Sequence, residues 1–209
     1  MVLNKPVVLI GYSGHGYVVG DAAIISGLNL KYYCDKCKSD KNPWSLDYLG
    51  YEGSVEFKGW SSGFDYILGI GDNKIRRKSW ELINAHNFKV LNVIHPSSVI
   101  SSKISIGDGN FISGNVSINA MTTIENHCIL NTGCIIEHDC TIKNGAHIAP
   151  GAVLAGGVSV GENSFIGANA VVKQGVKIGD DVIIGAGAVI LNDIPSSSKY
   201  VGNPGKKLN

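Results

Sequence analysis

Residues 124–148 read IENHCILNTGCIIEHDCTIKNGAHI, and an aliphatic residue returns at every sixth position of this stretch. The same spacing continues in both directions, from Ile94 to Ile190, without an insertion. Neither the 3.6-residue period of an amphipathic helix nor the alternation of a single strand gives a period of six. A six-residue repeat is typical of a parallel β-helix, in which short strands stack coil upon coil. We therefore expect residues 93–192 to form a β-solenoid domain.

Small residues accompany this repeat, two positions before most of the aliphatic ones. Side chains alternate between the two sides of a strand, so residues two apart point the same way. We expect both sets to point into the solenoid, where stacked coils bury one continuous aliphatic column. The small residues are Ser98, Cys128, Cys134, Cys140, Ala146, Ala152, Ser164, Ala170 and Ala188.

Cysteine spacing raises the question of a metal site. Cys128, Cys134 and Cys140 all occupy the small inward position. Three successive hexads place them on three sides of a coil, so we expect buried free thiols that pack in the core. Cys34 and Cys37 form a lone CxxC pair, and a zinc site requires a second pair, which does not lie nearby. We therefore expect no bound metal.

Composition and charge exclude several classes of function. The 209 residues carry a formal net charge of +1, which is unlike the basic surface of a nucleic-acid-binding domain. The apolar run at Val7–Ile10 is too short for a signal peptide or a membrane span. We expect a cytoplasmic protein with no nucleic-acid or membrane partner.

The first 92 residues have a different organisation. Val7–Ile10 predicts a buried strand, the glycine-rich segment 11–16 a turn, and the stretch from Tyr17 to Ile25 a helix. This order opens a doubly wound nucleotide-binding domain, in which a phosphate sits at the helix N-terminus. The turn does not have the dinucleotide spelling GxGxxG, so a glycine turn without a ligand remains the alternative. His15 favours the binding interpretation, because a structural turn does not require an imidazole.

Further elements of this domain follow from the pattern. We expect strands at Lys31–Cys34 and Phe64–Ile70, an irregular segment between them, and a helix at Lys74–Asn87. Ligands of such folds gather outside the carboxyl ends of the strands, which places Asp35 near a base or ribose. A solvated turn is the other interpretation of that acid. The solvent face of the second helix is expected to carry Arg76, Arg77 and Lys78.

The chemistry of the solenoid is expected at Glu137–His138–Asp139. Most outward positions carry Ser, Thr, Asn, Asp or Lys, whereas His138 has an acid on both sides. An imidazole inside an aliphatic prism would be costly, so we expect His138 in a turn with its ring outside. A carboxylate that accepts one ring N–H fixes the tautomer and makes the other nitrogen a better base. His138 is therefore the candidate general base, and a histidine that only decorates the surface is the alternative.

Four features together resemble the sugar acyltransferases of the PglD/NeuD type. They are the hexad run, the Gly11–Gly16 opening, the Ile136–Cys140 segment and the tail at Val201–Lys206. The resemblance covers almost the whole chain. It implies an α/β N-terminal Rossmann-like βαβ domain that binds a nucleotide sugar and a left-handed parallel β-helix of hexapeptide repeats. We expect residues 193–209 to form a short C-terminal cap over the open end of the solenoid.

The resemblance also implies an activity. Proteins of this family transfer an acetyl group from acetyl-CoA to the 4-amino group of a nucleotide-linked 4-amino-4,6-dideoxysugar. They serve surface-glycan biosynthesis (O-antigen, capsule or glycoprotein), and they assemble as homotrimers with active sites between subunits. We expect direct transfer without an acetyl-enzyme, because three of the five cysteines are predicted to face the core.

Site residues follow from the same resemblance. His138 matches the catalytic base and Asp139 the acid that follows it, although Glu137 remains an alternative partner of the ring. The acetyl-CoA site is matched by His147 at the thioester, by the backbone N–H of Gly156, and by Ala168, Ala186 and Lys206 along the coenzyme. The tail departs from its relatives at Gly205, where they often have Ala. The nucleotide-sugar pocket is matched by Ser13, Gly14, His15, Asp35, Lys36, Gly71 and Asn73.

Three other functions are also compatible with the sequence. An O-acetyltransferase acting on sialic acid or another sugar shares the fold and the base. A zinc hydratase on the same coil requires three converging histidines, and His127, His138 and His147 contain no suitably spaced pair. A non-catalytic solenoid that binds a partner is the third possibility. Neither the nucleotide (UDP, dTDP or GDP) nor the stereochemistry of the sugar can be read from the sequence.

Overall fold

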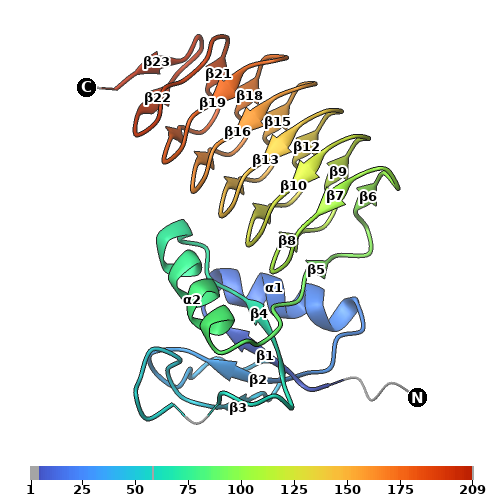
Figure 1. The fold of residues 1–209 in the computed structure, drawn as a ribbon, viewed down its shortest axis with the longest axis vertical. Helices are drawn as coiled ribbons and strands as arrows, with labels where there is room; N and C mark the ends of the chain where they lie inside the picture. The colour runs from blue at the N-terminus through green and yellow to red at the C-terminus, as the bar shows by residue number, and fades with distance from the viewer. Residues whose placement is uncertain (1–4, 58, 209) are drawn as a thin grey trace.

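The computed structural model describes residues 5–57 and 59–208, which form an α/β part followed by a long solenoid (Figure 1). Residues 1–4, 58 and 209, which the expected domain ranges include, lie outside the described residues. The two parts are stacked along the long axis of the molecule, and α2 extends beside the first coils.

A four-stranded parallel sheet forms the centre of the α/β part. Its order is β3 (Asp47–Tyr48), β2 (Leu30–Cys34), β1 (Val7–Ile10) and β4 (Asp65–Leu68). The apolar residues of β1 alternate between two cores: Val7 and Leu9 pack with α1 (Gly14–Ile25), and Val8 and Ile10 pack with α2 (Asn73–Ala85). Both faces of the sheet are covered, and the expected strands of this part are confirmed.

Helix α1 begins at Gly14, three residues earlier than the sequence pattern predicted. Gly16 explains this early start, because a Cβ at position 16 would collide with the carbonyl of Gly11 at the end of β1. Glycine therefore lets the first helical turn lie directly against the strand end. His15 is thus part of the helix rather than of the preceding turn.

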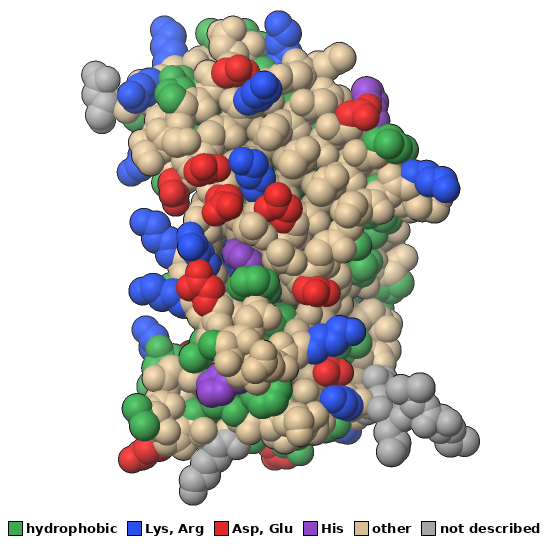
Figure 2. Space-filling view, viewed as in Figure 1, with side chains coloured by type: hydrophobic (Ala, Val, Ile, Leu, Met, Phe, Trp, Pro, Cys, Tyr) green, Lys and Arg blue, Asp and Glu red, His purple; other side chains and the backbone are tan. Residues whose placement is uncertain are grey.

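Helix α2 carries one correction to the expected pattern. Arg77 and Lys78 are exposed, and Arg77 pairs with Glu81 at 2.7 Å. Charged side chains gather where α2 lies against the solenoid (Figure 2). The prediction that Arg76 also faces solvent is wrong, because its side chain is only 1% exposed. The solenoid covers the side of the helix from which Arg76 projects, and helical periodicity alone does not reveal this contact.

The solenoid consists of seventeen two-residue strands, β5 to β21, and each ends on one of the predicted aliphatic positions. They form three parallel sheets, which we call faces 1, 2 and 3. Face 1 contains β5 (Val93–Ile94), β8 (Phe111–Ile112), β11 (Ile129–Leu130), β14 (His147–Ile148), β17 (Phe165–Ile166) and β20 (Ile183–Ile184). Face 2 contains β6 (Val99–Ile100), β9 (Ser117–Ile118), β12 (Ile135–Ile136), β15 (Val153–Leu154), β18 (Val171–Val172) and β21 (Val189–Ile190). Face 3 contains β7 (Ser105–Ile106), β10 (Thr123–Ile124), β13 (Thr141–Ile142), β16 (Ser159–Val160) and β19 (Lys177–Ile178).

Each coil contributes one strand to every face, so paired strands are eighteen residues apart, as Ile129 and His147 show. The aliphatic residues from Ile112 onward are buried in one cluster that runs along the interior. Cys128, Cys134 and Cys140 lie in the same cluster at three successive corners, as expected for packing groups. Ile94, Ile100 and Ile106 are only partly buried, because the first coil has a neighbouring coil on one side alone.

The end of the chain adds two strands to face 1. β22 (Lys199–Val201) pairs in parallel with β20, and β23 (Lys206–Lys207) pairs with β22 in the antiparallel direction. The N–H of Gly205 donates to the carbonyl of Val189 at 2.8 Å, so the tail also contacts the last strand of face 2. Within residues 5–57 and 59–208, neither helix has the length and apolar character that crossing a bilayer requires.

Candidate active site

The position of the α/β part relative to the three faces determines where site residues can meet. α1 packs on face 1, where Phe111 and Ile129 join its core cluster. α2 contacts the turns that lead from face 3 to face 1, which we call edge 3–1. The turns that lead from face 2 to face 3, which we call edge 2–3, lie across the triangular column from face 1. A group on edge 2–3 therefore faces away from the α/β part of its own chain.

His138 and Asp139 lie on edge 2–3, in the turn between β12 and β13. The imidazole Nδ1 is 2.7 Å from a carboxylate oxygen of Asp139, and the two side chains are 58% and 62% exposed. A carboxylate only accepts hydrogen bonds, so Nδ1 donates and the lone pair of Nε2 is left on the open side of the ring. The ring lies outside the column, as the sequence predicted.

Of the two acids beside His138, Asp139 is the one in contact with the ring. Its φ of 58° turns the backbone into the left-handed region, which Asp tolerates better than most residues. The carboxylate of Glu137 instead accepts a hydrogen bond from the side-chain amide of Asn119 at 2.9 Å. Of the two acids, the structure therefore brings Asp139 into contact with the imidazole and holds Glu137 at Asn119.

Gly156 lies one coil beyond His138 and makes room for the ring. A Cβ at this position would lie 2.6 Å from Cε1 and 2.7 Å from Nε2 of the imidazole. Among the described residues, no acceptor is recorded for the N–H of Gly156, whereas the next N–H, of Gly157, donates to the carbonyl of His138. Edge 2–3 thus presents a basic nitrogen and a backbone donor close together.

A second group of histidines lies at the interface between the α/β part and the solenoid. Burial, together with the charge of Arg76, lowers the pKa of His15 to about 4, of His127 to about 4 and of His147 to about 3. The rings of His15 and His147 are 6.3 Å apart. These histidines are neutral at pH 7.

Arg76 is the polar centre of this interface. Its guanidinium donates to the carbonyls of His127 and Gly145 on the solenoid, both at 2.8 Å, and to the carbonyl of Gly71 at 3.0 Å. It also donates to the side-chain oxygen of Asn73 at 2.9 Å. The arginine therefore ties the end of β4 and the start of α2 to two successive coils.

His147 does not lie beside His138 within one chain. It projects from face 1, packs against Phe165 and faces His15, whereas His138 lies on the opposite edge. Ala168 and Ala186 lie at a third place, in the turns from face 1 to face 2, and Lys206 is in exposed β23. Of the residues expected at the acetyl-CoA site, only Gly156 meets His138 in the same chain.

The carboxyl ends of β1, β2 and β4 surround a cavity of about 470 Å³, which we call the strand-end cavity. Four expected residues line it, namely Ser13, Asp35, Lys36 and Gly71. His15 and Asn73 point to the solenoid instead, and no neighbour lies within 4 Å of a Cβ built on Gly14. The sequence did not indicate several other lining residues, because they lie in the irregular segment or along α2. These are Tyr51, Glu52, Gly53, Ile75, Lys78, Ser79 and Leu82.

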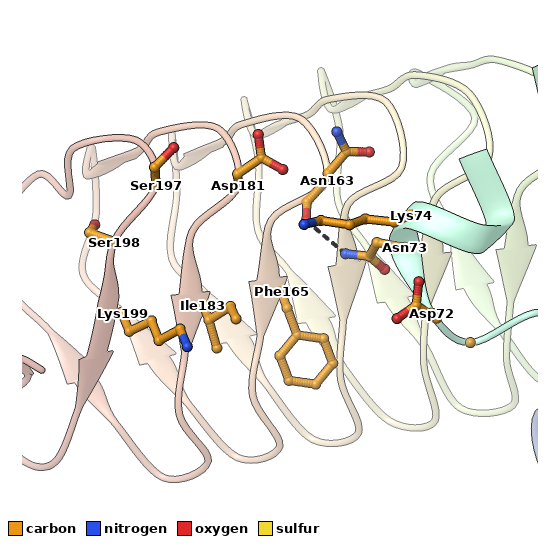
Figure 3. Close-up of a pocket in the computed structure, with 11 residues that line it drawn as sticks. Asp72, Asn73, Lys74, Asn163, Phe165, Asp181, Ile183, Ser197, Ser198 and Lys199 are labelled. Atoms are coloured by element: carbon orange, nitrogen blue, oxygen red, sulfur yellow. Dashed lines mark hydrogen bonds between the residues drawn. The ribbon is translucent and has the colours of Figure 1, made fainter. Parts of the chain in front are cut away.

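A second cavity, of about 730 Å³, separates the start of α2 from face 1 (Figure 3). Phe165, Ile183 and Lys199 project into it from neighbouring strands, opposite Asp72 and Asn73. Asn73 crosses to the solenoid and donates to the carbonyl of Asn163 at 2.8 Å. Gly71 and Asp72 line both cavities, so a ligand held at the strand ends can extend toward face 1.

Metal chemistry finds no support in the arrangement of ligand-type side chains. Over the described part of the chain, no three His, Cys, Asp or Glu side chains converge in a way that could hold a metal ion. Cys34 is buried and Cys37 is exposed, and neither belongs to such a group.

Two family models match the chain. The model of the PglD N-terminal domain matches residues 6–83. The model of the bacterial transferase hexapeptide (six repeats) matches residues 121–156 and 157–192.

Known proteins show the same combination of parts. A curated relative, GDP-perosamine N-acetyltransferase of Escherichia coli O157:H7, is 36% identical over 103 residues, which is 49% of this chain and 47% of that protein, so the match spans about half of each. The acetyltransferase domain of PglB from Neisseria gonorrhoeae FA1090 is 33% identical with a TM-score of 0.92, over 98% of this chain and 100% of that one. That domain has also been solved with acetyl coenzyme A. Perosamine N-acetyltransferase from Caulobacter crescentus, solved with CoA and GDP-perosamine, is 35% identical with a TM-score of 0.90, over 98% and 97% of the two chains.

Proposed function

Because the chain belongs to the family of bacterial hexapeptide transferases with a PglD-type N-terminal domain, we propose that it is an N-acetyltransferase. It transfers an acetyl group from acetyl-CoA to the amino group of a nucleotide-linked amino sugar. The acceptor is the 4-amino group of a 4-amino-4,6-dideoxysugar, and the product serves surface-glycan biosynthesis. The relatives support the reaction class, since two of them are named as N-acetyltransferases of perosamine.

The observation that carries the proposal is the contact between His138 and Asp139 on an open edge, beside a glycine N–H. Nε2 of His138 takes a proton from the sugar amine as the nitrogen attacks the thioester carbonyl. Asp139 stabilises the imidazolium that results, and the N–H of Gly156 donates to the developing oxyanion. The tetrahedral intermediate then collapses, and CoA leaves as the thiolate or, with the proton from His138, as the thiol.

Direct transfer fits the positions of the thiols. Cys128, Cys134 and Cys140 are buried in the solenoid interior, and burial raises the pKa of each thiol. Cys34 is buried in the α/β part, and Cys37 lies in the loop after β2. None of the five lies on the surface of edge 2–3 beside His138, so the amine is the nucleophile that attacks acetyl-CoA.

The site is shared between chains. The strand-end cavity belongs to the part that packs on face 1, and His138 lies on the opposite edge of the same solenoid. A nucleotide sugar bound in one chain therefore meets the base of a second chain. A homotrimer with three equivalent clefts satisfies this requirement, and in it we expect Ala168 and Ala186 of one chain to lie next to His138 of another.

A thiol-release assay tests the proposed reaction. Purified protein is given acetyl-CoA and a panel of UDP-, dTDP- and GDP-linked 4-amino sugars, with the matching 4-hydroxy sugars and sialic acid as competitors. We expect CoA release with the amino sugars and none with the hydroxy sugars. Preference for a hydroxyl acceptor would make the protein an O-acetyltransferase, and failure to bind acetyl-CoA would indicate a non-catalytic solenoid.

A further inference from the structure

We propose that Glu52 recognises the base of the bound nucleotide and selects guanine. This rests on the proposed function for the assignment of the strand-end cavity to a nucleotide.

Three acids line the strand-end cavity, and they differ in their partners. Asp35 accepts backbone N–H groups on both oxygens, from Tyr12 at 2.8 Å and from Lys36 at 2.7 Å. Asp72 caps α2 by accepting the N–H of Ile75 at 2.9 Å. Both carboxylates therefore already hold the backbone of the cavity in place.

Glu52 is the acid with an unmet requirement. Its side chain is 8% exposed, and Oε1 accepts a hydrogen bond from the hydroxyl of Ser79 at 3.2 Å. Oε2 is buried without a partner. Leaving a buried carboxylate oxygen unpaired is costly, so a ligand with an N–H donor at this point would be strongly favoured.

Burial of the Glu52 carboxyl group also favours a ligand that donates hydrogen bonds to it. Desolvation raises the pKa of its carboxyl group, and hydrogen bonds from the backbone of Glu52 and from Ser79 only partly offset this. Donors from a ligand would stabilise the ionised form and remove part of that penalty. Tyr51, Ile75 and Leu82 line the same cavity. The ring of Tyr51 offers a flat surface for a base, and the two aliphatic side chains offer apolar contacts.

The chemistry of the bases then determines which one fits. Guanine presents N1–H and the N2 amino group side by side, and a carboxylate accepts both at once. Uracil and thymine present a single N3–H between two carbonyl oxygens, and a carboxylate opposite those oxygens would repel at least one of them. Adenine offers its amino group next to an acceptor nitrogen. The carboxylate of Glu52 therefore matches guanine and disfavours the other three bases.

The order of residues along the cavity agrees with a nucleoside diphosphate bound in this direction. Glu52 contacts Ser79 in the middle of α2, Asp35 and Lys36 come directly after β2, and Ser13 precedes the N-terminus of α1. Gly71 then leads to the cavity beside Phe165. We expect base, ribose, phosphates and sugar to follow one another in this order.

Calorimetric titration of the full chain with GDP, UDP and dTDP tests the preference without any transfer reaction. We expect GDP to bind roughly 10–100-fold more tightly than UDP or dTDP, which is the range for one charged hydrogen-bond pair. Tighter binding of UDP or dTDP, or no binding of any nucleotide, would overturn the assignment.

The variant Glu52→Gln supplies the sharper test. An amide keeps one acceptor and replaces the other oxygen by a donor, which fits xanthine, whose C2 carbonyl stands where guanine has its amino group. We expect this variant to lose GDP affinity by roughly tenfold or more and to gain affinity for XDP. A variant that only disturbed the fold would lose both ligands, and equal loss of both would contradict the proposal.

Asp35→Asn is the matched control, because it removes one charge from the same cavity at a carboxylate already bound to the backbone. It should weaken all nucleotides without changing their order. Acetyl transfer to a UDP- or dTDP-linked amino sugar with no preference for GDP would refute guanine selection and leave the proposed function intact. Selective GDP binding without acetyl transfer to any amino sugar would refute the proposed function and leave guanine selection intact.

Discussion

His138 and His147 are nine residues apart in the sequence and lie on opposite sides of the solenoid. The separation explains the difference, since nine residues are half of the eighteen-residue coil. His138 is in a turn, largely exposed, and bonded to a carboxylate. His147 is on face 1, covered by the α/β part, and burial lowers its pKa to about 3. The position within the repeat thus decides whether a histidine is exposed beside a carboxylate or buried under the α/β part.

Removal of the exposed imidazole should give the largest effect. His138→Ala should lower kcat by roughly 10²–10⁴-fold, the usual contribution of a positioned general base. The melting temperature should stay close to that of the wild type, because the side chain is 58% exposed. CoA release and thermal unfolding measure the two quantities. Turnover near the wild-type rate would remove His138 from the mechanism.

Crowding the same imidazole should have the next largest effect. In Gly156→Ala, the new methyl group would lie 2.6 Å from Cε1 of His138 and must displace the ring. A displacement on the order of 1 Å can cost about 10²-fold in rate. We expect a fall in kcat with little change in KM for the nucleotide sugar. Gly157→Ala is an unsuitable control because of its positive φ, so Gly114→Ala, in a turn from face 1 to face 2, serves instead.

The two acids beside His138 should respond differently to loss of charge. Asp139→Asn removes the charged partner of Nδ1 and should lower kcat roughly tenfold or more. Glu137→Gln changes a carboxylate that contacts Asn119 instead, and it should retain near-normal turnover. Steady-state kinetics of the pair distinguishes them. If Glu137→Gln proved the more damaging change, the assignment of the orienting acid would have to be reversed.

The buried histidines should be detected through pH-dependent stability. His15, His127 and His147 have folded-state pKa values of about 4, 4 and 3, below the ordinary value of 6.5, so the unfolded chain binds more protons between these limits. Their contribution is fully present above pH 6.5 and is lost as the pH falls toward 4. The urea midpoint should decrease over this window.

His147→Gln should flatten that decrease, because one group that titrates only in the unfolded chain is gone. The same substitution at exposed His86 is the matched control and should leave the slope unchanged. Equal slopes in the wild type and in His147→Gln would show that His147 is not held neutral by burial.

The solenoid could be predicted from the sequence almost residue by residue, because each coil repeats the same inward and outward positions. The strand ends from Ile94 to Ile190 and the outward ring of His138 follow from this rule. Arg76 could not be predicted, since its burial depends on contact between α2 and the carbonyls of His127 and Gly145, which are far away in the sequence. Glu52 could not be identified either, because its segment has no periodicity and only tertiary packing against Ser79 makes it part of a cavity.

In the proposed enzyme, the base and the nucleotide pocket of one reaction come from different chains. Mixed oligomers test it most directly, prepared by co-expression of His138→Ala and Ser13→Glu with different affinity tags. The first variant lacks the base, and the second places a negative charge at the turn expected to hold the phosphates. We predict that each variant alone is inactive and that the mixed oligomer regains acetyl transfer. Mixed oligomers as inactive as either parent would show that both parts must lie in one chain, which contradicts the account.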